Sequence, residues 1–486
     1  ASLSLIPGSG EEPTSSTSSL SSDILLSNIQ RSPQKKIQTE WAEAFVRNKE
    51  IITTDYSVDY VQSNSLLFIH QKDNKNYLHI VIEPHRLNMS QYEQNVYAPL
   101  KLNAKISDSS GKTIHQEEKN IQIEMSPEDF KKIERRLPAI GDVIPLIEGN
   151  FTLNFLLRNT ASKEFSSIEE KVASPPPGSP SLSPVLFLYN ERNVNQVPQT
   201  IPFLFNDYQL YPNTQRIYTK ADDLIIYFEI YNFPGDLKSC TLSLAINSEE
   251  KILLSQKELI AEQRYFLKRF PLEDFGAGIF RVSVSVANPE GKELLATKAE
   301  FHITPLAAVP RPWNFNKIYP PLDHPYFSLI RADEYLGLEK YDQVIEEIGN
   351  FYVKENPHKE VALLLARAYF QKDDYVKVTE ILEPLKEVQD LEIFSLLGKA
   401  YFQLGNFPAG LDYFNKALVA GGEILEIINL IGYSYFKMNN PEEALKYLER
   451  SLKLNSDQPN IRKIIEEIKK RGKKNDNLPQ ELLSHI

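Results

Sequence analysis

Three of the eight histidines, His70, His79 and His85, lie close together in the sequence and come nearest to a cluster that could bind a metal or move a proton. They fall in segments that alternate apolar and polar residues, a pattern typical of strands with one buried face. No HExxH pair and no His/Asp triad spacing accompanies them. We therefore expect polar strand or surface histidines, and we predict neither a metal site nor a cofactor.

Other catalytic motifs are also missing from the sequence. It contains no GxSxG elbow, no phosphate-binding loop and no EF-hand loop. The glycines of GSGEEPTSS (8–16) follow no predicted strand, so they do not match a dinucleotide-binding turn. We predict that the protein is not an enzyme.

The composition indicates several packed domains. The chain of 486 residues is too long for one compact core, and about two to four domains are expected. Acidic residues (65) outnumber Lys and Arg (54), and the net charge of −11 argues against a nucleic-acid partner. Cys240, the only cysteine, stands in an alternating pattern and is expected to be a core residue. No apolar run is long enough for a membrane-spanning helix.

The two ends of the chain read as tails. Residues 1–36 are rich in Ser, Thr and Pro and are expected to be free unless the apolar pieces SLSLIP and DILLSNI add as strands to a neighbour's sheet. Residues 472–486 form the C-terminal tail. The chain starts with Ala1, which favours an exported protein, periplasmic or extracellular, whose leader has been removed; a cytoplasmic location stays open.

Residues 37–173 carry the pattern of a first β-sandwich. SLLFIHQ and NYLHIVIEP flank the turn KDNK, and LKLNAKISD and TIHQEEKNIQIEM flank SSGK, which predicts two hairpins. SPEDFKKIERRL predicts a short helix capped by Ser126. Short strands separated by polar turns favour an immunoglobulin-like sandwich.

A second set of strands occupies residues 185–306, between Pro-rich linkers at 174–184 and 307–324. The stretch 149–172 aligns without gaps with 278–301. The shared positions are Gly149/Gly278, Phe151/Phe280, Asn159/Asn288 and Lys163/Lys292. We predict two tandem immunoglobulin-like β-sandwiches; chance similarity between two strand–turn–strand patterns is the alternative.

From residue 325 onward the pattern is helical, and one motif recurs four times. RADEYLGLEKYDQVIEEI, LARAYFQKDDYVKVTEIL, LGKAYFQLGNFPAGLDYF and IGYSYFKMNNPEEALKYL each place a tyrosine after a small residue and then a second amphipathic helix. The small residues are Ala332, Ala366, Gly398 and Gly432. This pattern resembles the tetratricopeptide repeat (TPR), in which the small residue lets two helices approach. The resemblance implies an α-solenoid of four repeats and a capping helix over 325–471.

The TPR resemblance also implies a concave face made by the first helix of each pair. Projected onto this sequence, it predicts aromatic rings flanked by hydrogen-bonding groups that grip an extended peptide or a partner helix. The predicted residues are Arg367, Phe370, Gln371, Ser395, Lys399, Phe402, Gln403, Asn429, Tyr433, Phe436 and Lys437. The alternative is that the phenylalanines pack between adjacent repeats.

A second resemblance covers about residues 50–470. The strands from PFLFNDYQLYPN (202–213) through GAGIFRVSVSVANPEG, followed by the repeats, look like the C-terminal part of exported bacterial proteins named for a GWxTD domain, although the Gly-Trp-x-Thr-Asp motif is absent. We predict a protein–protein interaction or structural protein, a subunit of an exported or extracellular bacterial assembly whose N-terminal tail docks on a neighbouring subunit. The alternatives are a periplasmic adaptor with a peptide in the TPR groove, and a hydrolase with an unrecognised site between domains.

Overall fold

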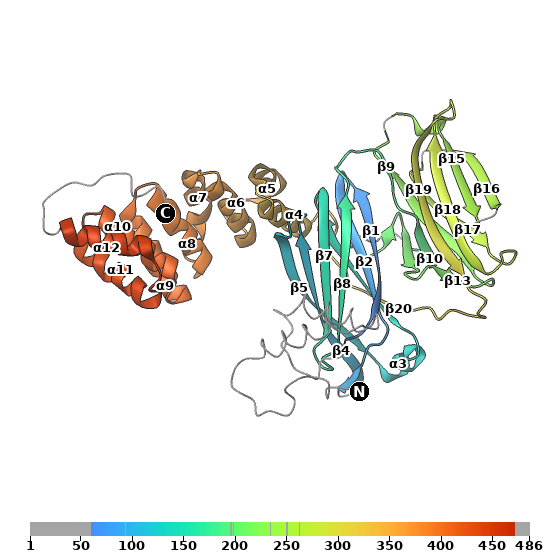
Figure 1. Ribbon diagram of the computed structural model, residues 1–486, viewed down its shortest axis with the longest axis horizontal. Coiled ribbons are helices and arrows are strands. Elements are labelled where there is room, and N and C mark those ends of the chain that lie inside the picture. Colours follow the sequence, from blue (N-terminus) through green and yellow to red (C-terminus); the bar gives the residue numbers. More distant parts are fainter. Residues whose placement is uncertain are drawn as a thin grey trace, which may run out of the picture. The chain divides into compact units, whose positions relative to one another are not determined.

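The computed structural model describes residues 60–471 apart from 93, 195–196, 198, 234, 249–250 and 262. Both predicted tails, and the predicted start of the first sandwich, lie outside the described residues. The chain divides into two compact units, Ala1–Phe327 and Ser328–Ile486. The first is built from strands and the second from helices (Figure 1).

Two sheets make up the first half of the β unit. One has the order β1-β2-β6-β20, and the other has the order β3-β4-β7-β8 with β5 paired to β4. Their strands are β1 (Ser63–Lys72), β2 (Lys75–Pro84), β3 (Ser90–Tyr92), β4 (Asn95–Ser107), β5 (Thr113–Met125), β6 (Pro138–Leu146), β7 (Gly149–Asn159), β8 (Phe165–Ser174) and β20 (Trp313–Asn316).

Both predicted hairpins and the predicted short helix are confirmed. β1 pairs with β2 around Asp73 and Asn74, whose φ angles of 51° and 57° suit a two-residue hairpin loop, and β4 pairs with β5. The helix α3 (Pro127–Ile133) begins after Ser126, whose side chain accepts a hydrogen bond from the Asp129 backbone N–H.

The second half of the β unit also contains two sheets, with a common hydrophobic core that includes the buried Cys240. One sheet has the order β11-β12-β10-β14-β17 with β9 paired to β14, and the other has the order β13-β19-β18-β15-β16. Their strands are β9 (Ser181–Leu182), β10 (Leu186–Asn193), β11 (Leu204–Phe205), β12 (Tyr208–Pro212), β13 (Ile217–Tyr218), β14 (Asp223–Tyr231), β15 (Thr241–Asn247), β16 (Ile252–Leu259), β17 (Tyr265–Pro271), β18 (Gly278–Ala287) and β19 (Glu293–Ile303); a 3₁₀ turn spans Leu237–Ser239.

The two aligned sequence stretches form equivalent hairpins, β7–β8 and β18–β19. Gly149 and Gly278 begin the first strand of each hairpin with φ angles of 146° and 153°, a region that favours glycine. Asn159 and Asn288 each accept a backbone hydrogen bond with their side-chain oxygen in the turn that follows. The likeness therefore extends from residue types to their structural roles in these hairpins.

Both Pro-rich segments contribute strands. β20, within the predicted linker 307–324, pairs in parallel with β6, and β9, within 174–184, pairs with β14. These strands are short, and their partners are distant in sequence, so local patterns gave no sign of them.

A buried cluster connects the two halves of the β unit. Phe68 and Val81 from the first half pack with Phe205 and Tyr227 from the second, and the rings of Phe68 and Phe205 lie 5.6 Å apart. The β unit therefore has a core that continues from one half into the other.

Glu83 on β2 makes the stability of the β unit depend on pH. Its side chain is buried, with 4% exposed, and Oε2 accepts a hydrogen bond from Thr214 Oγ1 at 2.5 Å. Burial raises the pKa of Glu83 from 4.5 to about 7, although the Thr214 hydrogen bond and the Arg311 charge act in the opposite direction. Because the folded state favours the protonated carboxyl, this contribution is fully present below pH 4.5 and is lost as the pH rises through about 7.

As the pH rises from about 5 to about 8, the β unit should lose stability. We expect Glu83→Gln to make this loss smaller by up to about 3 kcal/mol. Urea unfolding followed by Trp313 fluorescence in a Trp41→Phe background measures this, because Trp313 lies in the β unit and is then the single tryptophan of the sequence. Glu300→Gln, a change at an exposed ion pair with Arg281, is the control. An unchanged pH dependence in Glu83→Gln would contradict the assignment.

The second unit consists of helix pairs followed by a single helix. The pairs are α4 (Pro325–Gly337) with α5 (Tyr341–Ile348), α6 (Lys359–Gln371) with α7 (Tyr375–Leu382), α8 (Leu391–Gln403) with α9 (Phe407–Gly421), and α10 (Leu425–Lys437) with α11 (Pro441–Leu454); α12 (Pro459–Arg471) is last, and 3₁₀ turns span Gly349–Phe351 and Glu383–Leu385. The isoleucines of α12 cover the core beside Leu448, as expected of a capping helix.

The small residues lie where the two helices of a pair meet. A Cβ atom added to Gly398 would come within 2.5 Å of Phe414, and one added to Gly432 within 2.6 Å of Leu448. In the turns between paired helices, Glu339, Asp373, Gly405 and Asn439 all have positive φ. This repeated left-handed residue ends the first helix of each pair and sets the direction of the second.

Candidate functional site

The predicted ligand-binding residues lie on α6, α8 and α10, the first helices of the second, third and fourth pairs. We call their half-exposed and exposed members the first-helix face: Arg367, Phe370, Gln371, Ser395, Lys399, Phe402, Gln403, Asn429, Phe436 and Lys437. Tyr433 is different, because only 4% of it is exposed and it packs in the core with Leu448 and Ile461.

The phenylalanines of the first-helix face are partly buried. Phe370 packs edge-on against Tyr375 at 5.2 Å, and Phe402 packs edge-on against Phe407 at 5.4 Å. Phe402 also contacts the core cluster of the last repeat, and so does Phe436. Each ring therefore has a packing role and also leaves a part exposed.

Three polar residues of the first-helix face each pair with a residue that follows their own pair of helices. Arg367 Nε lies 2.5 Å from Glu392 Oε1. Lys399 Nζ lies 2.6 Å from Glu426 Oε1. Asn429 Nδ2 donates to Gln458 Oε1 at 2.9 Å. These partners were not predicted from the sequence, although acidic residues in the first turn of a following helix are a signal that could have revealed them.

The remaining members of the first-helix face differ in how available they are to a ligand. Ser395 donates its hydroxyl to the backbone oxygen of Leu391 at 2.7 Å, so it offers a ligand only an acceptor. Gln371, Gln403 and Lys437 are exposed near the C-terminal ends of their helices. Exposed ion pairs such as Arg367–Glu392 contribute only about 0–1 kcal/mol, so an acidic group of a partner can replace Glu392 at little cost.

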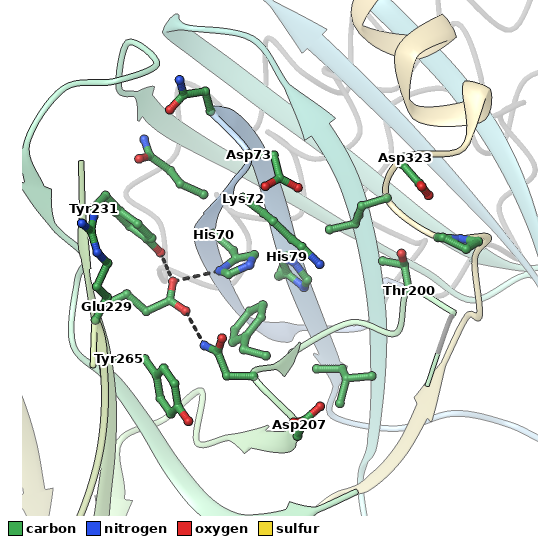
Figure 2. A pocket seen from close by; sticks show the side chains of 18 of the residues that line it. His70, Lys72, Asp73, His79, Thr200, Asp207, Glu229, Tyr231, Tyr265 and Asp323 are labelled. Carbon is green, nitrogen blue, oxygen red and sulfur yellow. Dashed lines mark hydrogen bonds and ion pairs between the residues drawn. The ribbon is translucent and has the colours of Figure 1, made fainter. Parts of the chain in front are cut away.

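A second candidate site is a cavity of about 920 Å³ in the β unit. It is lined by the end of β1 with its turn, the segment around β11, the end of β14, and residues 264–265 and 321–323. Figure 2 shows His70, His79, Glu229 and Tyr231 on its wall, with Lys72, Asp73, Asp207 and Asp323 around them.

Glu229 is the centre of a buried hydrogen-bond network on the cavity wall. Its carboxylate accepts hydrogen bonds from Tyr227, from Tyr231 and, at 3.2 Å, from Asn206 Nδ2. His70 Nδ1 lies 2.8 Å from Glu229 Oε2. Burial alone would raise the pKa of Glu229, but the His70 charge and these donors lower it, so the group is a carboxylate.

His79 lies beside this network and has a defined tautomer. Its Nδ1 accepts the backbone N–H of Phe203 at 2.9 Å, and burial lowers the pKa of His79 well below its usual value. The ring is therefore neutral and carries its proton on Nε2, which has no hydrogen-bond partner among the described residues.

The sequence predicted that these histidines are polar strand or surface residues. His70 and His79 do lie on strands, β1 and β2, but His79 is buried, with 2% exposed, whereas His85, one residue beyond β2, is exposed. The sequence could not show that His70 pairs with Glu229, because the two residues are distant in the chain. Within the described part of the chain, no three His, Cys, Asp or Glu residues are placed to hold a metal ion.

Comparison with known families identifies the helical motif. The tetratricopeptide repeat model matches residues 426–458, the segment that contains α10 and α11. Residues 426–458 form a TPR. The matched segment is the last of the four helix pairs predicted from the sequence.

Within the described part of the chain, no helix is long and apolar enough to cross a membrane.

No curated protein matches the chain. Among solved structures, MamA of MSR-1 is 17% identical over 30% of this chain and 86% of its own, with a TM-score of 0.29. TTC0263, described as a thermophilic TPR protein in Thermus thermophilus, is 16% identical over 30% of this chain and 81% of its own, with a TM-score of 0.25. Similarity this low says nothing about what this chain binds.

Proposed function

We propose that this protein is a non-enzymatic interaction protein that binds other proteins through its helical unit and its sheet edges. The observation that carries the proposal is the TPR at residues 426–458, within a unit of successive helix pairs. The first-helix face adds partly exposed phenylalanines and weakly paired charges, which suit contact with a partner.

More specifically, the protein is a subunit of an exported bacterial assembly, and the N-terminal tail of one copy docks on β16 of the next. β16 stands at the end of its sheet and exposes 65% of Ile252 and 72% of Leu259. An edge strand with exposed apolar side chains is a template for strand addition, and SLSLIP in the tail alternates apolar and polar residues. Export is proposed from the resemblance to GWxTD-domain proteins, and cell fractionation tests it.

Sedimentation of the full chain tests the assembly. We expect species larger than a monomer whose proportion rises with concentration, and we expect monomers after removal of residues 1–36. Ile252→Lys with Leu259→Lys is expected to have the same effect, because charge on an edge strand opposes pairing. Ile279→Lys, a change at another exposed isoleucine on the central strand β18, is the control. A chain that stays monomeric, or a shortened chain that still associates, would rule out the tail as the connector.

The alternative is an adaptor that binds a peptide on the first-helix face, and the partial exposure of Phe370 and Phe402 favours it. We expect peptides selected from a displayed random library to bind at least about tenfold more weakly to Phe370→Ala, a loss of about 1.4 kcal/mol. Val419→Ala, at a side chain 90% exposed on α9, is the control. Loss of helical circular dichroism in Phe370→Ala would show instead that this ring belongs to the core.

A further inference from the structure

The cavity beside Glu229 presents a hydrogen-bond donor that has no partner among the described residues. His79 offers its Nε2–H, because Nδ1 is occupied by the Phe203 backbone. His70 Nδ1 lies 2.8 Å from Glu229 Oε2, so the other nitrogen of that ring, Nε2, is turned away from the carboxylate. The two rings are nearly perpendicular, with centroids 5.9 Å apart.

The donor on His79 limits the kinds of ligand group that fit beside it. Its Nε2–H needs an oxygen that accepts a hydrogen bond, and a hydroxyl can accept it while donating its own proton to a neighbouring side-chain oxygen. A metal ion would need a free lone pair on both histidines, and Nε2 of His79 carries a proton. The arrangement therefore suits a hydroxyl group.

The rest of the lining suits an uncharged polar molecule. Lys72 and Arg264 are the cations, and they are outnumbered by Asp73, Asp207 and Asp323 together with Glu229, which disfavours phosphate and other anions. Side-chain amides, which both donate and accept, make up much of the remaining polar wall: Gln71, Asn74, Gln199, Asn206 and Asn232. Gln71 Nε2 is buried without a hydrogen-bond partner among the described residues.

The cavity also has the size and the apolar surface that such a ligand needs. Its volume of about 920 Å³ lies within the range of ligand pockets, roughly 300–1,000 Å³. Phe205 and Tyr265 contribute ring surfaces to the lining. A ring whose hydroxyls meet amides and imidazoles while its C–H groups meet aromatic faces satisfies both parts of the wall.

We infer that this cavity binds a neutral, hydroxyl-rich ligand, a sugar unit, with one hydroxyl accepting the Nε2–H of His79. The inference rests on the β unit alone and is independent of the function proposed for the helical unit. A protein of an extracellular assembly that also binds sugar would attach that assembly to a glycan surface.

The test is saturation-transfer NMR and titration of the full chain with methyl α-D-glucoside, methyl α-D-galactoside, methyl α-D-mannoside and N-acetylglucosamine. We expect at least one of them to bind with a Kd near or below about 1 mM. In His79→Phe the affinity should fall at least tenfold, and in His85→Phe, the same change at an exposed histidine outside the cavity lining, it should stay within twofold. Gln199→Trp, which places a large ring at an exposed lining position, should also lower it at least tenfold.

Three results would overturn the inference. One is no binding of any of these sugars at about 10 mM, tenfold above a 1 mM Kd. Another is binding that neither His79→Phe nor Gln199→Trp weakens, which places the sugar elsewhere. The third is binding of glucose 6-phosphate or inorganic phosphate but none of the neutral sugars. If His79→Phe does not fold, Gln199→Trp alone decides, because Gln199 is exposed.

Discussion

Replacing Lys119 by Met is expected to destabilise the β unit by about 3–5 kcal/mol. Lys119 on β5 lies 2.9 Å from Asp142 on β6 and 2.8 Å from Glu117, and it joins the two sheets of the first half of that unit. Burial lowers the pKa of Lys119, but the two carboxylates raise it well above its usual value, so the side chain is charged. Without it, the Asp142 carboxylate, 1% exposed and hydrogen-bonded to Tyr319, stays buried without its cation.

Urea unfolding followed by Trp313 fluorescence in the same Trp41→Phe background measures this effect. Lys101→Met is the control, because Lys101 forms a largely exposed ion pair with Glu118 at 2.6 Å and its loss should cost less than about 1 kcal/mol. Lys119→Met combined with Asp142→Leu should recover part of the lost stability, because it removes the buried Asp142 charge and leaves only the less buried Glu117 without its cation. If Lys119→Met and Lys101→Met have equal effects, the buried pair does not hold the sheets together.

Replacing Gly398 by Val is expected to destabilise the helical unit by about 3 kcal/mol. Even a single Cβ would lie 2.5 Å from the ring of Phe414, which is fully buried and has no room to move. Loss of helical circular dichroism in urea measures the change, and the Trp313 transition of the β unit should not move.

The control for Gly398→Val is Ala420→Val at an exposed position of α9, where the change should cost less than about 1 kcal/mol. Trimming Phe414 to Leu in the Gly398→Val background should restore part of the loss, because it makes room for the added atoms. Equal effects of Gly398→Val and Ala420→Val would contradict the close helix approach that defines these pairs.

The helical unit was the most predictable part of the chain. The recurrence of Ala332, Ala366, Gly398 and Gly432 reports a contact between helices that are neighbours in sequence, so a local pattern contains it. The β hairpins around Asp73 and Gly111 were predictable for the same reason. That each phenylalanine of the first-helix face packs against its own turn or the next repeat depends on side-chain geometry, which the pattern does not specify.

The features that sequence reasoning missed all join distant residues. β20 pairs with β6, Glu229 meets His70, and Lys119 meets Asp142, and in each case one partner sits in an ordinary alternating strand. In the sequence, a buried carboxylate on a strand cannot be distinguished from a solvent-exposed one until its partner is known. The candidate cavity is therefore a product of the tertiary structure, whereas the TPR is visible in the sequence.

Cross-linking of a mixture of ¹⁴N- and ¹⁵N-labelled full chains tests most directly whether copies of this chain associate through the N-terminal tail. Lys35 and Lys36 lie at the end of the tail, and Lys257 lies on β16. We predict mixed-isotope cross-links between these two regions, which are lost in Ile252→Lys with Leu259→Lys. Cross-links from the tail that always join residues of one isotope, or mixed cross-links that never include the tail, would contradict the account.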